Sequence, residues 1–86
     1  MSSPLSRELQ DEGAQIYLTL NRWLEASFPE ADGLSVIFAL SLQLGYMLGV
    51  NSAAYGLSTT QTDAMVTYIA DTVRREAEST RREVIQ

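Results

Sequence analysis

The stretch "LSVIFALSLQLGYMLGVNSAAYG", residues 34–56, decides the fold of this chain. It contains no charged side chain, and large apolar residues fill most of its length. Asp32 or Gly33 provides a start signal, and Gly56 stands where a helix commonly ends in a left-handed glycine. The pattern therefore predicts a helix over residues 34–55.

Two glycines inside this stretch leave an alternative open. Glycine costs about 1 kcal/mol relative to alanine in a helix interior, so Gly45 and Gly49 weaken the second half of the segment. Together with Asn51 they allow a break around Val50–Ser52 in place of one continuous helix.

A helix is predicted before this stretch, over residues 4–27. Ser3 is placed to cap it, with Pro4 at the first helical position, where the missing N–H does no harm. Pro29 disfavours helical geometry in the preceding residue, so the helix should end near Ser27 or Phe28. Its apolar stripe recurs at helical spacing: Leu9, Ile16, Leu20 and Trp23.

A third helix is predicted over residues 59–84. Ser58 and Gln61 match the capping box, in which each side chain bonds to the other residue's backbone N–H. A narrow apolar stripe follows: Val66, Ile69, Val73, Ala77, Thr80 and Val84. On the outer face we expect i,i+4 ion pairs between Asp71 and Arg75, Arg74 and Glu78, and Glu78 and Arg82.

Together these patterns predict an all-α protein with a single domain, residues 1–86. The three helices should form a three-helix bundle of up-down-up hairpins. The helix over residues 34–55 is hydrophobic nearly all round, so we expect it to be central and nearly fully buried.

Two neighbouring helices can hardly cover every side of this central helix, so we expect it to meet a second copy. Self-association would use Ser41, Gly45 and Gly49, which recur at a spacing of four, with Leu42 and Tyr46 beside them. Small residues in such a row let two backbones approach closely. The alternative is that the glycines let another helix of the same chain pack tightly.

A membrane span is the other interpretation of the apolar stretch, and we expect it not to hold. The run includes the polar residue Gln43, and no arginine lies near either end; the nearest are Arg22 and Arg74. The amphipathic helices on both sides also need cover for their own apolar stripes.

Composition narrows the function classes. The net charge is −5, which disfavours direct binding to nucleic acid phosphates. Histidine, cysteine and lysine are absent, so the usual general bases, nucleophiles and Schiff-base formers are missing. Three acidic residues share one helix face: Glu8, Asp11 and Glu12. Such a cluster is more often a solvated acidic first turn of a helix than a metal site. We expect a non-enzyme without cofactor or metal.

The remaining function class is protein–protein interaction, as a cytoplasmic regulatory or adaptor protein that forms a homodimer and binds an unidentified protein target. Trp23 and Phe28 are candidate partner anchors, because large aromatic side chains dominate interface energetics. Their alternative role is to cap the bundle core. The alternative function is a phage-type inhibitor, anti-CRISPR-like in size and charge or another nucleic-acid mimic, that blocks a basic site on its target. The acidic side chains would carry this effect: Glu8, Asp11, Glu12, Glu25, Glu30 and Asp32.

Overall fold

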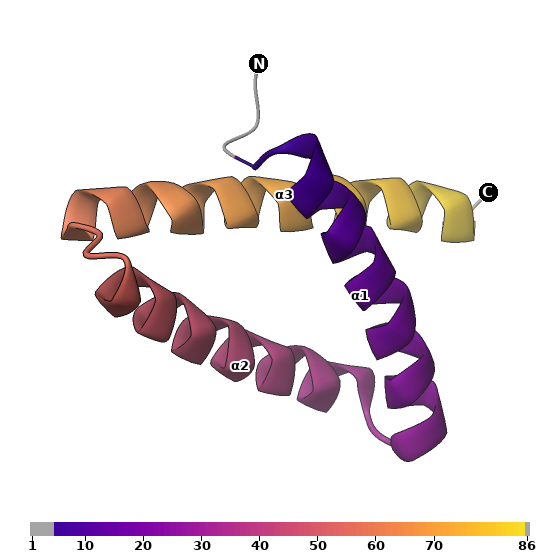
Figure 1. Ribbon diagram of the computed structural model, residues 1–86. Coiled ribbons are helices and arrows are strands. Elements are labelled where there is room, and N and C mark those ends of the chain that lie inside the picture. The colour runs from indigo at the N-terminus through magenta and orange to yellow at the C-terminus, as the bar shows by residue number, and fades with distance from the viewer. Residues whose placement is uncertain (1–4, 86) are drawn as a thin grey trace. The chain divides into compact units, whose positions relative to one another are not determined.

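The computed structural model describes residues 5–85 as three α-helices joined by two short connections (Figure 1). α1 spans Arg7–Ser27, α2 spans Gly33–Ala54 and α3 spans Thr59–Ile85. The described residues contain no strand, which confirms the predicted all-α class.

α1 begins at Arg7, later than predicted. Ser6 has extended backbone angles (φ −65°, ψ 161°), and its hydroxyl accepts a hydrogen bond from the Leu9 N–H at 3.2 Å. Ser6 is therefore the cap, whereas the predicted pair Ser3 and Pro4 lies outside the described residues. The sequence offers two serines with the same capping chemistry, and spacing alone did not distinguish them.

α1 ends where Pro29 requires it to end. Ser27 is the last helical residue, and Phe28 has non-helical angles (φ −135°, ψ 56°) while its N–H donates to the Leu24 carbonyl at 2.9 Å. The helix continues through Gly13 without a break.

α2 is one continuous helix, so the predicted alternative of a break around Val50–Ser52 is wrong. At its start the Asp32 carboxylate accepts a hydrogen bond from the Leu34 N–H at 2.8 Å, as a capping side chain does. Inside the helix the Asn51 amide donates to the Met47 carbonyl at 2.8 Å, one turn earlier. The polar side chain is thus satisfied locally.

The end of α2 is a Schellman motif. Gly56 has a φ of +64°, the only positive φ among the described residues. The Leu57 N–H donates to the Ser52 carbonyl at 2.8 Å, and the Gly56 N–H donates to the Ala53 carbonyl at 3.3 Å. The predicted role of Gly56 is confirmed.

α3 begins with the predicted capping box. The Ser58 N–H donates to Gln61 Oε1 at 2.8 Å, and the Gln61 N–H donates to Ser58 Oγ at 3.1 Å. A hydroxyl–hydroxyl bond of 3.0 Å joins Thr62, in the first turn of α3, to Ser52, in the last turns of α2. These bonds fix the connection between the two helices.

The charged residues of α3 pair differently from the prediction. The Arg74 guanidinium contacts the Asp71 carboxylate at 2.7 Å, one turn back at i,i+3. Arg75 and Arg82 donate through Nε to backbone carbonyls four residues earlier, those of Asp71 and Glu78. The predicted i,i+4 ion pairs are wrong because backbone carbonyls and a closer carboxylate attract the guanidinium groups instead.

No side chain is buried among residues 5–85, so the predicted burial of α2 is wrong for the single chain. The chain divides into two compact units, the first ending at Ile37 and the second beginning at Phe38. In the first unit the half-buried residues are Leu5, Leu24 and Val36. In the second unit they are Leu48, Ser52, Thr62, Met65, Tyr68 and Ile69. Cover for α2 is thus confined to residues near its two ends.

Replacing Gly56 by alanine should lower the free energy of unfolding by about 1–2 kcal/mol, because an L side chain is disfavoured in the left-handed conformation. The control is Gly13→Ala, where a Cβ would have nothing within 4 Å and the backbone is helical. That change should raise the free energy of unfolding by up to about 1 kcal/mol. Urea unfolding at one fixed protein concentration, followed by circular dichroism, measures both; equal destabilisation would contradict the prediction.

Candidate interaction surface

A row of small residues runs along α2 at the predicted positions. Ser41, Gly45 and Gly49 recur every four residues, so they lie on one face of the helix, with Leu42 and Tyr46 beside them. We call these five residues the α2 seam. All are exposed, and a Cβ added at Gly45 or Gly49 would have no atom within 4 Å. The single chain therefore leaves room for a second backbone along this row.

The α2 seam is part of a larger exposed apolar surface. Leu42 is 61% exposed and Tyr46 69% exposed, although such side chains are usually covered in folded proteins. The other large apolar residues of α2 that are exposed are Leu34, Ile37, Phe38, Leu40, Leu44, Met47 and Val50. A contiguous apolar surface of this kind marks a site of interaction with another protein or a membrane.

α2 also has the length and composition of a membrane-spanning helix. It has 22 residues, it is strongly apolar and carries no charged side chain, and none of its residues is buried. Among the described residues it is the one helix with these properties. A helix in the core of a soluble protein can have the same length and apolar composition, but such a helix is mostly buried. Because α2 is exposed, its apolar surface can be covered in one of two ways, by another protein surface or by lipid.

The two predicted partner anchors lie together at the end of α1. The rings of Trp23 and Phe28 meet edge to face, with centroids 5.5 Å apart and planes at 74°. Each side chain is 53% exposed. The sequence predicted both residues separately but not their contact. Trp23 also lines a shallow apolar hollow on α1 with Gln15, Ile16, Thr19 and Leu20.

The predicted acidic face lies at the start of α1. Glu8, Asp11 and Glu12 are exposed in the first turns of α1, where negative charge is favoured by the helix dipole. Residues 5–85 contain no group of side chains arranged to hold a metal ion.

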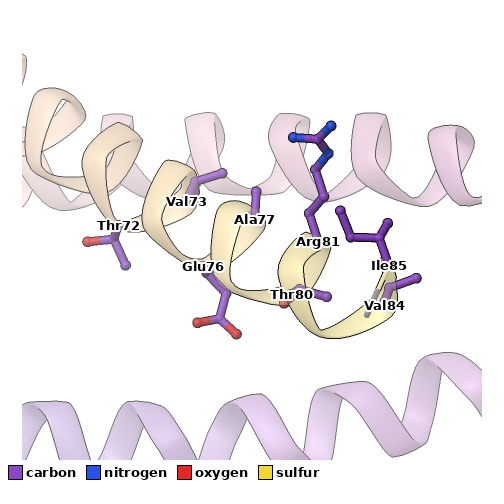
Figure 2. A pocket seen from close by; sticks show the side chains of 8 residues that line it. All are labelled: Thr72, Val73, Glu76, Ala77, Thr80, Arg81, Val84 and Ile85. Carbon is purple, nitrogen blue, oxygen red and sulfur yellow. The ribbon is translucent and has the colours of Figure 1, made fainter.

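A groove that sequence reasoning did not identify lies along the second half of α3 (Figure 2). Its lining includes the small side chains of Ala77 and Thr80, and all of its lining residues belong to this one helix. They are Thr72, Val73, Glu76, Ala77, Thr80, Arg81, Val84 and Ile85. The signal was present in the sequence, as small residues in the middle of the apolar stripe, but the stripe was interpreted as facing a bundle core.

Comparison of this chain with family models, curated proteins and solved structures finds no match.

Replacing Phe28 by alanine should remove the edge-to-face contact with Trp23 and lower the free energy of unfolding by about 1 kcal/mol. Trp23 is the only tryptophan, so near-ultraviolet circular dichroism and fluorescence report on its surroundings directly. The control is Leu18→Ala, an exposed residue of α1 outside this ring pair. The prediction fails if the tryptophan signals of Phe28→Ala equal those of the wild type.

Proposed function

We propose that this protein is a small, acidic, non-enzymatic regulatory or adaptor protein that acts by protein–protein interaction and forms a homodimer through the α2 seam. One observation carries the proposal: α2 is apolar on nearly every side, yet none of its residues is buried in the single chain. Burial of apolar surface stabilises by about 25 cal/mol per Å². Covering α2 is therefore the largest stabilisation open to the chain.

The α2 seam suits a second copy of itself. A two-fold axis brings the same row of residues from each chain together, so the surface must be complementary to itself. Glycine and serine side chains allow the two backbones to approach closely. α2 contains no charged residue, so two identical copies meet without like-charge repulsion.

The opposite face of α2 carries large apolar side chains, and we assign it to α1 and α3. The apolar stripe of α1 supplies part of the surface needed to cover the large-residue face in a three-helix bundle. On α3 we assign this role to Met65 and Ile69, which are already half-buried. The residues of that face are Val36, Ile37, Leu40, Leu44, Met47 and Leu48. In this arrangement α2 is central, and the dimer supplies the burial that the single chain lacks.

The protein target is proposed to bind at the Trp23–Phe28 pair. These two half-exposed rings contact each other and form an aromatic surface at the end of α1. Aromatic anchors of this type often carry a large share of the binding energy in interfaces. The absence of histidine, cysteine and lysine supports a role without catalysis.

A membrane-embedded α2 is the second candidate, favoured by its length, its hydropathy and its exposure. Against it stand Gln43 and Asn51 within the helix, and Glu30 and Asp32 at its start in place of basic residues. The homodimer predicts that purified protein remains in solution without detergent and does not float with liposomes in a density gradient. Co-flotation with liposomes would favour the membrane candidate and contradict the dimer in solution.

Replacing Gly45 by leucine should weaken the homodimer at least tenfold, because overpacking a close contact costs about 1–3 kcal/mol. In the single chain the new side chain meets open space and replaces a poor helix former, so the isolated helix gains stability. Sedimentation equilibrium measures the dissociation constant.

The control for this variant is Ala54→Leu, which adds similar bulk about 180° around the same helix. This change should leave the dissociation constant within about twofold of the wild type. The proposed contact is contradicted if Gly45→Leu keeps the wild-type mass and melting temperature.

A further inference from the structure

A second apolar row runs along α3, and its spacing is that of a coiled coil. The α3 seam comprises Val66, Ala70, Val73, Ala77, Thr80 and Val84, at alternating intervals of four and three residues. Such a heptad spacing places all six side chains on one face toward a partner helix. Among them, Val66 is 47% exposed, Val73 59% exposed and Val84 76% exposed.

Charged residues of opposite sign flank the α3 seam on its two sides. Glu76 precedes Ala77 and lies on one side, whereas Arg81 follows Thr80 and lies on the other. Glu83 and Arg74 repeat these two positions seven residues away, on the same sides as Glu76 and Arg81 respectively. One edge of the seam is therefore acidic and the other basic.

We infer that two copies of this chain pair in parallel along the α3 seam. In a parallel pair the acidic edge of the α3 seam in each copy faces the basic edge in the other copy. Glu76 of one copy therefore lies beside Arg81 of the second copy, whose number is five higher. The two-fold axis forms this pair twice. An antiparallel pair would place acidic edge against acidic edge and basic against basic. The inference rests on the proposed self-association, and it adds a second contact with a defined direction.

The side chains that this pairing needs are not engaged within the chain. Arg74 forms an ion pair with Asp71 at 2.7 Å, but neither Glu76 nor Arg81 forms an ion pair within residues 5–85. The groove shown in Figure 2 is lined by both of these residues and by Ala77 and Thr80. Its small side chains provide the space that a second helix at close distance would occupy.

Charge reversal tests the pairing. Glu76→Arg alone places positive groups against Arg81 of the second copy, and Arg81→Glu alone places negative groups against Glu76. Each variant by itself should associate about tenfold more weakly than the wild type, since two attractive pairs become repulsive. An equimolar mixture of the two variants should associate as tightly as the wild type, because both pairs in the mixed dimer are again of opposite charge.

Cysteine cross-linking tests the direction. The chain has no cysteine, so Ala70→Cys and Val84→Cys each introduce a single thiol. In a parallel pair each variant should form disulfide-linked dimers with itself upon mild oxidation. The two positions are about 21 Å apart along the helix. In an antiparallel pair at most one of them can lie at the two-fold axis and cross-link with its own copy. An antiparallel pair centred near Ala77 would cross-link only a mixture of the two variants.

The outcomes separate this inference from the proposed homodimer. Rescue in the mixture together with self-cross-linking at both positions supports parallel pairing. The α3 pairing is overturned if the charge reversals have no effect and neither cysteine variant cross-links with itself. If Gly45→Leu still disrupts the wild-type dimer in that case, the α2 contact is retained. A monomeric wild type overturns both. Circular dichroism of each variant shows that α-helix content is retained, so that a loss of association is not a loss of folding.

Discussion

The whole structure depends on how the apolar surface of α2 is covered. Its 22 residues contain no charge, and no side chain among residues 5–85 is buried. A chain of 86 residues buries only about 60–65% of the surface that it exposes when unfolded, so its internal core is small. α1 and α3 are amphipathic, with one apolar stripe each, so together they present less apolar surface than α2 needs. In the proposed homodimer a second copy supplies the missing cover without requiring any new kind of side chain.

The local structure could be predicted from the sequence because each helix end is specified by a few neighbouring residues. Gly56 adopts the left-handed conformation that ends α2, and the capping box of Ser58 and Gln61 forms both of its bonds. Asp32 caps α2, and Pro29 ends α1 at the preceding turn. In each case the hydrogen-bond partner lies within five residues, so spacing alone determines the geometry.

Features that depend on competition or on distant residues could not be predicted in this way. Ser3 and Ser6 have the same capping side chain, and their spacing does not determine which of them caps α1; the structure gives Ser6 as the cap. Arg74 turns back to Asp71 because several acceptors lie within reach of one long side chain. The burial of α2 was predicted from its composition. An apolar composition indicates only that the surface of the helix needs to be covered. Whether that cover comes from the same chain is decided by surfaces far apart in the sequence.

The two seams differ in what they specify about an assembly. The α2 seam is uncharged, so its packing is governed by shape and leaves the direction of the second helix open. The α3 seam has an acidic and a basic edge, so it distinguishes parallel from antiparallel pairing. A closed dimer uses both seams only if one two-fold axis relates both pairs of helices. If the axes differ, each chain has two separate partners and the assembly grows beyond two copies. The stoichiometry therefore follows from the relation between the seams, and the charges beside α3 restrict that relation more strongly than the glycines of α2.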